Sequence, residues 1–584
     1  MNTLGMPNNL LKTPDKSSLL DRFFRLIYRN PLYSYTLLGR TPERLLGTPP
    51  ELIHGDAALG QSILDGTLLV ARERQPFVDI SNIAENTSPN WQAYLHGFNW
   101  LSDLRAVGNN QARNLAKNHV TTWLNTYTKW SPLAWQADIL GQRLTNFIVH
   151  FGFFAKEAPQ EFYDLFFLEV VKQARHLNRS IIKSTSGPSR IQGLKGLIYC
   201  GLSLPTHESY RQNGLKLLKN ELDHQLNHDG CHYSRNPKIH MNVLTDLISI
   251  RDALAAAHID IPHWLIGAIE NMVPILRTFK HADGGLAFFN GSNDSNPERI
   301  NILLAKSGVK TRAVSSAPHS GFQRLNSGKT IVIMDTGSPP LKSENKWGHS
   351  GTLAFEMSSG KDRIIVNCGM HENASIEWQQ ALRSTAAHST MVVDNVNSSE
   401  LSSVGGFAHK LGQVTTSRRE IEGSTIIEAS FDGYSKLFGL THRRLIMLAP
   451  EGGEIQGEDN LIGPNSHQYC LRFHLHPNVQ VTLLQDQHSA ILKPRRGTGW
   501  RFTCVDQVIK LEESIYFDAN SSHRRTRQII ASGSVEKHGT TVKWRLSKIW
   551  HLSFLQEALS LQYFKNIVIC ANRKLRIVME LNVE

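Results

Sequence analysis

The sequence predicts an α+β multidomain protein in which a helical first half is followed by an antiparallel β-sandwich. Three observations support this fold class. The chain has 584 residues, which is too long for one ordinary hydrophobic core. From about Ser17 to Lys280, apolar residues recur every three to four positions, as in amphipathic helices. After residues 283–291 the period changes to two, with turn residues at short intervals.

The helical pattern begins near the N-terminus and returns in several separate segments. Apolar residues between positions 19 and 27 repeat at three-to-four spacing, and the same spacing is found in residues 164–171, 191–198 and 243–250. Proline-containing breaks, such as residues 186–188 and 236–237, separate the helices. Sequential helices of this kind either stack into a solenoid or close into a toroid. Between the first of these helical segments and the later ones, residues 68–80 predict a short strand-rich segment.

The second half contains the strand-like segments. They are residues 330–335, 363–366, 391–394, 425–430 and 445–448. The change of period near residues 300–315 marks the domain boundary. We expect an N-terminal extension and lead-in segment at 1–80, a helical domain at 81–305, a sandwich at 315–555 and a tail at 556–584. Residues from 564 onward form either an edge strand or part of a disordered tail.

The composition is that of an ordinary soluble globular protein, with 40% hydrophobic and 20% charged residues. The formal net charge of +12 favours an acidic partner, such as nucleic acid, an anionic membrane surface or an acidic polysaccharide. The alternative is a basic surface that only keeps the protein soluble. No run of Lys and Arg with interleaved aromatic residues is present, which argues against nucleic acid.

The cysteines and the N-terminus give no sign of a secreted protein. The six cysteines have no CxxC spacing and are expected to be reduced and buried: Cys200, Cys231, Cys368, Cys470, Cys504 and Cys570. The first 24 residues lack an apolar stretch after a basic start, so no secretory signal is readable. No run of about 18 apolar residues predicts a membrane span. Taken literally, these features predict a cytoplasmic protein.

Two histidines form the most informative pattern. His349 lies in residues 347–357 (WGHSGTLAFEM), and His388 lies in residues 385–394 (TAAHSTMVVD). Between them, apolar and polar residues alternate as in β-strands. Histidines on neighbouring strands can point to one spot, as a metal site or a sugar-binding acid/base pair requires.

These motifs, on helices followed by a sandwich, resemble the heparinase II/III-like polysaccharide lyases. Further matching motifs are residues 96–101, 229–237, 251–252, 442–444, 457–459 and 472–477. The resemblance implies an incomplete (α/α) toroid packed on a β-sandwich, with a glycan cleft between them. It also implies β-elimination of uronate-containing polysaccharides and a periplasmic or cell-envelope location. That location disagrees with the missing signal, so either the start is mis-assigned or the substrate is intracellular.

β-Elimination requires three chemical contributions. The uronate carboxylate must be stabilised as enolate-like charge develops, a base must remove the C5 proton, and an acid must protonate the leaving oxygen. By the resemblance, an Asn or His and a Tyr come from the helical half, and a His comes from the sandwich. Some related lyases also hold a structural zinc with histidines and an Asp.

In the helical half the chain departs from the family pattern. Pro188 and Ser189 stand where the resemblance implies the Asn and His, and Ile239 stands where it implies the Tyr. His240 fits the pattern and is interpreted either as a base facing the cleft or as an amphipathic helix residue. Tyr233 would replace the missing Tyr if its loop reaches the cleft. Otherwise this is a loop leading into the helix, with Ser234 or Asn236 as its cap and Arg235 as a surface charge.

In the sandwich, one residue remains of an expected His-x-His-x-Asp pattern. It is His349, while Trp347 and Gly351 occupy the other two places. Asn367 stands where the resemblance implies a zinc-binding Asp, and His388 is present. We therefore expect His349 and His388, with Asn367, either to hold a zinc ion or to bind a sugar directly. The alternative is a pair of buried histidines with satisfied hydrogen bonds.

Basic and aromatic side chains are the candidates for substrate binding. Arg143, Arg251, Arg383, His442, Arg443, Arg444 and Arg472 are candidates to bind carboxylate or sulfate groups. Trp100, Trp135, Trp347 and Trp378 are candidates to stack on sugar rings. For any one arginine a surface ion pair is the alternative, and for any one tryptophan it is core packing.

The leading hypothesis is a heparinase II/III-like protein that acts on an acidic, uronate-containing glycan, with β-elimination as the implied reaction. His240 or Tyr233, together with His349 and His388, would carry it. The first alternative is a non-catalytic glycan-binding or cell-envelope assembly protein that uses the same cleft, and the residues that favour it are Pro188, Ser189, Ile239 and Gly351. The second is a hydrolase or lyase with a rearranged acid/base set.

Overall fold

The computed structural model describes most of the chain. The described residues are 19–70, 73–81, 87–184, 186–293, 296–339, 348–370, 375–402, 406–407, 412–464, 466–517, 523–537 and 539–549. The side chains of residues 19–22 are also outside the description. Three sequence-based expectations therefore lie outside the described residues: those for Trp347, for Cys570 and for the tail at 556–584.

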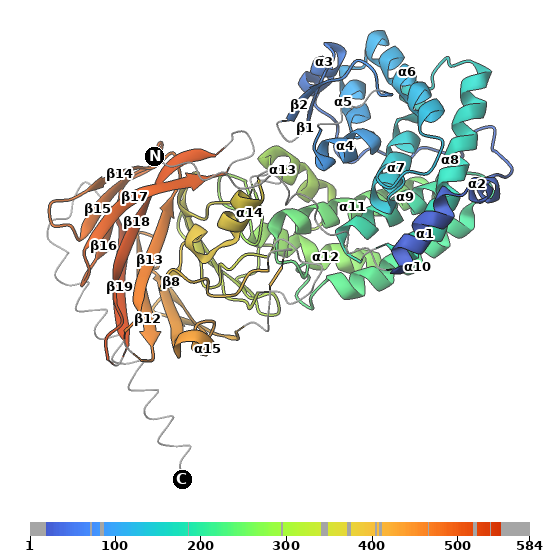
Figure 1. Cartoon of the computed structure of the whole chain (residues 1–584). Helices are drawn as coiled ribbons and strands as arrows, with labels where there is room; N and C mark the ends of the chain where they lie inside the picture. Colours follow the sequence, from blue (N-terminus) through green and yellow to red (C-terminus); the bar gives the residue numbers. More distant parts are fainter. Residues whose placement is uncertain are drawn as a thin grey trace, which may run out of the picture.

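The first part of the chain is helical (Figure 1). Its helices are α1 (Leu19–Arg29), α2 (Pro31–Leu37), α3 (Ala57–Leu64), α4 (Pro89–His96), α5 (Trp100–Val107), α6 (Asn110–Thr126), α7 (Ala137–Phe154), α8 (Gln160–Ser180), η1 (Ile181–Lys183), α9 (Pro188–Ser203), α10 (Glu208–Gln225), α11 (Pro237–Ala256), α12 (His263–Thr278) and α13 (Pro297–Lys306). A hairpin of β1 (Thr67–Val70) and β2 (Glu73–Pro76) follows α3, within the segment where strands are expected.

Local sequence explains where several of these helices begin. Pro occupies the first turn of α2, α4, α9, α11 and α13, where its missing N–H costs no hydrogen bond. Asn30, Ser88, Asn109, Asn236 and Asn296 each accept a hydrogen bond from a backbone N–H in the first turn. The proline breaks seen in the sequence therefore separate consecutive helices of one continuous array.

Helices α7 and α9 cross at close range because glycines face each other. A Cβ added at Gly141 would lie 2.5 Å from the Cα of Gly193, and one added at Gly196 would lie 2.5 Å from the Cα of Gly141. No larger residue fits at this crossing without moving a backbone. The contact holds the N-terminal end of α9, where the family resemblance implies catalytic residues, firmly against the helical core.

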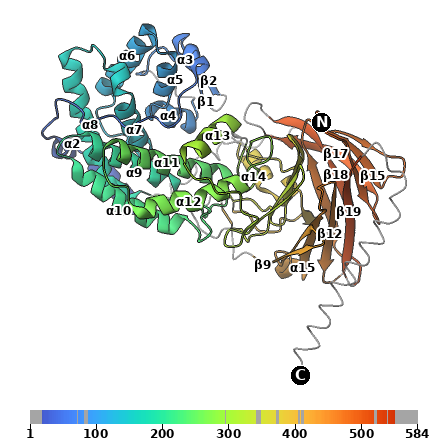
Figure 2. The same ribbon diagram turned by 180° about the vertical axis from the view of Figure 1, so that it is seen from behind.

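The second part of the chain forms two antiparallel sheets that face each other (Figure 2). Their strands are β3 (Ser316–Ala317), β4 (Phe322–Ser327), β5 (Thr330–Asp335), β6 (Phe355–Ser359), β7 (Asp362–Val366), β8 (Met391–Val393), β9 (Val414–Ile421), β10 (Ser424–Phe431), β11 (Thr441–Leu448), β12 (Glu454–Ile462), β13 (Gln468–Leu475), β14 (Gln480–Leu483), β15 (Ser489–Lys493), β16 (Trp500–Cys504), β17 (Ile509–Tyr516), β18 (Arg524–Ser534) and β19 (Thr540–Lys548). One sheet has the order β14-β15-β16-β19-β12-β11-β10-β9, and the other has the order β17-β18-β13-β7-β6-β5-β4-β3 with β8 beside β13. Three short helices interrupt the strands: α14 (Ile376–Arg383), η2 (Thr385–Ala387) and α15 (Ser435–Phe438).

The core between the sheets comes from alternate residues of the strands. Strands β11 and β12 show the alternation expected when one face is buried. The Trp544 ring stacks on Phe355 of the opposite sheet at 5.4 Å between centroids, and Phe473 packs edge-on against both rings.

All the strand-like segments of the sequence are strands in the structure, so the predicted α+β class is confirmed. The change from helices to strands falls between Lys306 and Ser316.

The five described cysteines are all free. Four of them are buried and Cys470 is half-buried, which agrees with the expectation of reduced cysteines. Within the described residues, no helix combines the length and the apolar character that crossing a membrane requires.

Buried ion pairs join the two domains. Arg235, in the loop before α11, pairs with Asp335 at the end of β5, and its guanidinium also donates to the carbonyl oxygens of Ser320 and Ser338. Both charged side chains are about 95% buried. Arg235 has a φ of 57°, a left-handed conformation that costs a non-glycine residue about 1–2 kcal/mol. Arg235 is therefore a domain-joining residue, and the expectation of a surface charge is wrong.

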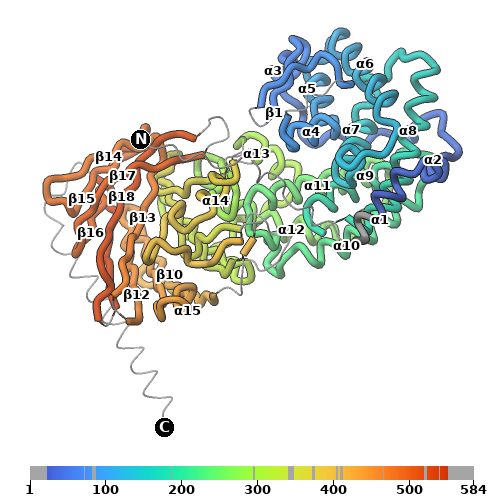
Figure 3. Tube along the Cα trace, viewed as in Figure 1, coloured from blue at the N-terminus to red at the C-terminus, as the bar shows by residue number. Residues whose placement is uncertain are grey.

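A second set of contacts lies beside the first. His281 hydrogen-bonds Glu356 at 3.0 Å, and Asp283 pairs with Arg363 at 2.8 Å. Arg324 donates to two carbonyl oxygens at the end of α12. Figure 3 shows α12 and α13, the last helices of the helical domain, next to the strands of the sandwich. The two domains therefore meet through fixed polar contacts rather than through a flexible linker alone.

Candidate functional site

His240 is a buried hydrogen-bonding residue of α11. Its Nε2 lies 2.9 Å from the carbonyl oxygen of Met272 and therefore carries the proton that it donates. Its Nδ1 accepts a hydrogen bond from the backbone N–H of His232 at 3.3 Å. Burial lowers the pKa of His240 to about 4. Both ring nitrogens are thus engaged, and the neutral ring holds α11 to α12 instead of facing an open cleft.

Tyr233 reaches the beginning of α9. Its side chain is buried and its ring lies 4.6 Å from that of His232. A Cβ at Gly187 would lie 3.7 Å from the Tyr233 hydroxyl oxygen. The hydroxyl is therefore beside Pro188 and Ser189, where the family pattern has its Asn and His. Of the two candidates in the helical half, Tyr233 is the one that the structure brings to this place.

The N-terminus of α9 is occupied by a carboxylate of the protein itself. Glu221 of α10 accepts hydrogen bonds from the backbone N–H of Gly187 at 2.8 Å, from Gln225 at 2.7 Å and from Arg190 at 3.0 Å. Burial alone would raise the pKa of Glu221, but the hydrogen bonds outweigh it and the pKa is lowered. A helix N-terminus favours an anion, and at α9 the Glu221 carboxylate already occupies that place. No sequence motif marks Glu221, because its partners lie 4 to 35 residues away along the chain.

His349 and His388 do meet, although they lie in loops and not on neighbouring strands. The His388 Nδ1 lies 2.8 Å from the Ser384 carbonyl oxygen, so this nitrogen is the protonated donor. The His388 Nε2 is then an acceptor, and it faces the His349 Nδ1 at 3.0 Å. His349 must therefore be protonated at Nδ1, which leaves a lone pair on its Nε2. That Nε2 is buried and has no hydrogen-bond partner among the described residues.

Both rings are neutral. Burial lowers the pKa of His388 to about 4. Burial, the adjacent His388 and Arg383 lower the pKa of His349 further below its usual value. Gly351 provides the space for this pair, because a Cβ there would lie 2.5 Å from the His388 ring. The place where the resemblance implies an Asp is thus filled by an imidazole.

Asn367 does not join the two histidines. Its side-chain oxygen accepts from the backbone N–H of Ser389 at 3.0 Å, and its amide nitrogen donates to the carbonyl oxygen of Phe288 at 3.1 Å. Zinc would need three or four converging donors, and among His349, His388 and Asn367 only the Nε2 of His349 has no hydrogen-bond partner within the described residues. Within the described part of the chain, no group of three or more His, Cys, Asp or Glu side chains is placed to hold a metal ion. The residues present therefore do not fit the zinc site that the resemblance implies.

Three of the arginines that are candidates for substrate binding serve the protein's own structure. Arg143 is fully buried, donates to Gln173 at 2.8 Å and stacks on Trp123. Arg383 is buried and donates to the carbonyl oxygen of Gly348, beside His349. Arg443 is half-exposed on β11 and pairs with Glu428 at 2.6 Å. All three arginines therefore bind partners within the protein, and none is placed to bind a carboxylate of a substrate.

The remaining basic candidates are similarly engaged. Arg444 and His442 both contact Asp459 at 2.7 Å in the sandwich core. Arg251 pairs with the adjacent Asp252, and Arg472 donates to Gln528. Of the described tryptophans proposed to stack on sugars, Trp100 and Trp135 are buried, whereas Trp378 is 40% exposed.

Trp378 borders a cavity of about 420 Å³ on the sandwich. The cavity lies between α14, η2 and strands β13, β17 and β18, and its lining includes His523, Arg525 and His474. The Trp378 and His523 rings stack with an angle of 22° between their planes. An exposed aromatic ring beside a guanidinium matches a sugar ring that carries a carboxylate. Residues 523–527 (HRRTR) are the signal in the sequence that would have pointed here.

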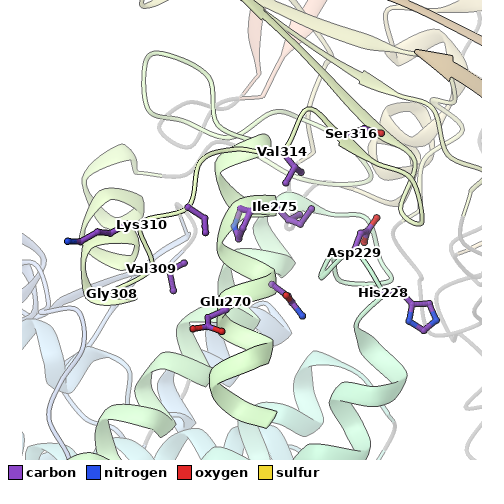
Figure 4. Close-up of a pocket in the computed structure, with 12 residues that line it drawn as sticks. His228, Asp229, Glu270, Ile275, Gly308, Val309, Lys310, Val314 and Ser316 are labelled. Atoms are coloured by element: carbon purple, nitrogen blue, oxygen red, sulfur yellow. The ribbon is translucent and has the colours of Figure 1, made fainter. Parts of the chain in front are cut away.

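A larger cavity of about 740 Å³ lies where the helical domain continues into the sandwich (Figure 4). Glu270 and Ile275 of α12 form one side, Lys310 and the connecting segment form another, and Asp229 borders the third. The Asp229 carboxylate accepts hydrogen bonds from the backbone and hydroxyl of Ser320 at 2.8 Å. The cavity contains none of the candidate catalytic residues.

Comparisons with known proteins identify relatives across nearly the whole chain. The family model "Heparinase II/III N-terminus" matches residues 78–310, and "Heparinase II/III-like, C-terminal" matches residues 309–545. FtsZ-localized protein C from Caulobacter vibrioides (strain NA1000 / CB15N) is 31% identical over 536 residues, which cover 87% of this chain and 91% of that protein.

Solved structures with the same fold are polysaccharide lyases. A heparinase III structure aligns with a TM-score of 0.68 at 13% identity, covering 90% of this chain and 91% of the other. The heparan sulfate lyase HepC from Pedobacter heparinus aligns with a TM-score of 0.59 at 14% identity, covering 84% and 82%. At these identities the likeness establishes the fold, a helical toroid followed by a β-sandwich, as the sequence predicted.

Proposed function

The chain belongs to the heparinase II/III-like family, and on that premise we propose that it is a glycan-binding protein of the cell-division machinery without β-elimination activity. Its fold is that of glycan lyases. A fold does not by itself determine chemistry, which resides in the site. The proposal therefore rests on what the individual residues of the site can do.

The proposed lack of β-elimination activity rests on the occupied N-terminus of α9. β-Elimination needs a group there that stabilises the carboxylate of the substrate while negative charge develops. Here the Glu221 carboxylate already accepts the hydrogen bond of the Gly187 backbone N–H. A uronate brought to the same place would meet a like charge in a buried setting, which disfavours both binding and enolate formation. Ile239 in place of the family's Tyr removes the expected acid/base group as well.

Support for retained glycan binding comes from the sandwich. Trp378, His523 and Arg525 surround an open cavity of about 420 Å³. The net charge of +12 also favours a polyanionic partner. We propose that an acidic sugar stacks on Trp378 with its carboxylate directed to Arg525.

The placement in cell division follows the named relative. FtsZ-localized protein C shares 31% identity with this chain over most of both lengths. We propose that this protein also localises with FtsZ. A fluorescent fusion in its native host tests this directly, with FtsZ labelled in a second colour. Co-localisation that disappears on FtsZ depletion is expected, and a distribution independent of FtsZ would refute the placement.

The experiment for the site measures activity and binding on the same samples. The protein is incubated with a panel of uronate polysaccharides while the ultraviolet absorbance of unsaturated products is followed, and affinity electrophoresis in the same polysaccharides measures binding. We expect no absorbance change and retarded migration in at least one polysaccharide. Trp378→Ala and Arg525→Ala should remove the retardation, and Arg495→Ala, on an exposed turn of the sandwich, should not. Retardation that is unaffected by Trp378→Ala would exclude this cavity.

An active lyase is the second candidate, and one observation favours it. The Nε2 of His349 carries a lone pair with no partner among the described residues, and the Tyr233 hydroxyl lies at the beginning of α9. A base and a hydroxyl of this kind are what proton abstraction requires. Appearance of an unsaturated product that is lost in His349→Gln and in Tyr233→Phe would establish this candidate and overturn the first.

A further inference from the structure

A small apolar cluster lies beneath the cavity at Trp378, separate from the cores of the two domains. Its buried members are Cys368, Met370, Leu382, Ala387 and Phe517. Three of them, Cys368, Leu382 and Ala387, also line the cavity of about 420 Å³. These three residues form the apolar floor of the cavity, beneath the exposed groups at its mouth.

Ser514 and His474 lie beside the apolar floor and line the same cavity. The His474 Nε2 lies 3.0 Å from the Ala386 carbonyl oxygen, so this nitrogen is the protonated donor. The His474 Nδ1 is then an acceptor, and the Ser514 hydroxyl, at 2.7 Å, donates its proton to it. The Ser514 oxygen is therefore an acceptor for any group that enters the cavity.

The bottom of the cavity carries no charge. Burial lowers the pKa of His474 to about 3, so its ring is neutral at physiological pH. Burial also raises the pKa of the Cys368 thiol to about 12, and a neutral thiol packs like a small apolar group. A sulfate, a carboxylate or an ammonium group placed there would lose its hydration without gaining a counter-charge.

The mouth of the cavity is aromatic and charged. Trp378 is 40% exposed, and its ring lies 6.0 Å from that of Phe517 in the apolar cluster. Arg525 of β18 and Glu513 of β17 are exposed and line the cavity. An indole ring suits the apolar face of a sugar, a guanidinium suits its carboxylate, and a carboxylate accepts hydrogen bonds from its hydroxyl groups.

The bottom of the cavity is more selective than its mouth, because it fits a substituent that combines a small apolar group with an N–H donor. An acetamido group has both, since its methyl group is apolar and its amide N–H can be donated to Ser514. A sugar hydroxyl would instead lie against the apolar floor and lose its hydration. An O-acetyl ester has the methyl group but no N–H.

We propose that the cavity binds an N-acetylated sugar of an acidic glycan, with the acetamido methyl group on Leu382 and Ala387 and the acetamido N–H donated to Ser514. The carboxylate of the same sugar or of its neighbour then contacts Arg525. This inference rests on the proposed binding of an acidic glycan at Trp378, and it adds which substituent of that glycan the cavity selects.

The test compares heparosan oligosaccharides, in which N-acetylglucosamine alternates with glucuronate, with the same oligosaccharides carrying N-formyl groups. The N-formyl form keeps the carboxylates and the N–H and lacks only the methyl group. Titration calorimetry with the full-length protein should show about fourfold weaker binding of the N-formyl form, which is the value of one buried methyl group. In saturation-transfer NMR, the acetamido methyl protons should receive more saturation from the protein than the sugar-ring protons.

Two variants test the residues at the bottom of the cavity. Ser514→Ala should weaken binding of the N-acetyl form about fivefold, the value of one hydrogen bond. Ala386→Leu, at an exposed position of the cavity lining, should abolish the difference between the N-acetyl and N-formyl forms by covering the apolar floor. The matched control is Ser532→Ala, at an exposed position of β18 outside the cavity lining, and it should bind like the unaltered protein. Circular dichroism verifies that every variant is folded.

The outcomes separate this inference from the proposed function on which it rests. Equal affinity for the two forms, with binding that Trp378→Ala still removes, would overturn acetamido selection and leave glycan binding at the cavity intact. Methyl protons that receive less saturation than the ring protons would do the same. Absence of binding to either form and to uronate polysaccharides without acetamido groups would overturn both.

Discussion

The contact between Arg235 and Asp335 gives the most direct test of how the two domains are held together. The perturbations are Arg235→Met, Asp335→Asn and the double variant. Both side chains are about 95% buried, and the guanidinium also donates to Ser320 and Ser338. Removing one partner leaves the other charge, or its carbonyl partners, unsatisfied in the junction. A loss of this kind destabilises a protein by about 3–5 kcal/mol.

The double variant should be less destabilised than the sum of the single variants by about 1.5–3 kcal/mol. It contains no unpaired charge, so the penalty of a buried ion is absent. The left-handed backbone of Arg235 adds to the argument, because its cost of about 1–2 kcal/mol persists in every variant and cancels in the comparison.

The pH dependence provides an internal check. Burial raises the pKa of Asp335 even though Arg235 opposes the shift, so Arg235→Met should raise it further. A carboxyl whose pKa is higher in the folded than in the unfolded protein stabilises the fold at low pH and loses that contribution as pH rises through the folded value. The defect of Arg235→Met should therefore shrink on acidification toward pH 5, relative to the unaltered protein.

Urea unfolding measures these effects through far-ultraviolet circular dichroism, which follows the helices, and tryptophan fluorescence, which follows both domains. The two transitions should coincide in the unaltered protein and separate in the single variants, as the domains lose their coupling. Strictly additive losses, or an Arg235→Met defect that is equal at pH 7 and pH 5, would refute the assignment of a coupled buried pair.

Three further predictions concern the histidines and their surroundings. Because the pKa of His240 is about 4 in the folded protein and about 6.5 in an unfolded chain, unfolding takes up a proton between these values. Stability should be full above pH 6.5 and fall by up to about 3 kcal/mol as pH drops to 4, and urea midpoints in His240→Gln should show a shallower slope. Gly351→Ala should push against the His388 ring, lower the stability by about 1–3 kcal/mol and shift the imidazole proton resonances of both histidines. Glu221→Gln should weaken the cap of α9 by about 1–2 kcal/mol in thermal unfolding, whereas Glu161→Gln, on the exposed start of α8, should have no effect.

The fold could be predicted from the sequence because its signals are local. The three-to-four spacing of residues 243–250 and the prolines at the helix starts identify α11 and its neighbours without knowledge of tertiary contacts. The alternation in residues 425–430 identifies β10 in the same way. His349 and His388 also meet, as the sequence predicts, but they lie in the loops before β6 and β8 and not on neighbouring strands.

The state of the site residues could not be predicted, because it depends on contacts between distant parts of the chain. His240 is neutral and engaged because Met272, 32 residues away, presents a carbonyl oxygen to it. Arg235 is buried because Asp335, 100 residues away, lies at the end of β5. Nothing in the local sequence distinguishes a histidine whose two ring nitrogens are engaged from one that is free to move a proton.

The same contacts limit how the protein can respond to a glycan. Asp229, Arg235 and Asn236 all lie in the loop that in the family pattern precedes the catalytic Tyr. Asp229 binds Ser320, Arg235 binds Asp335, and Asn236 donates to Asn290 at 2.9 Å. Closure of the toroid onto a glycan would have to break the contacts of Asp229 and Arg235 with the sandwich, and separating the buried Arg235–Asp335 pair alone costs about 3–5 kcal/mol. Binding energy is thus not available to drive closure, and recognition must use surfaces that are already formed, such as the cavity at Trp378. This is a reason, independent of the missing Tyr, to expect binding without turnover.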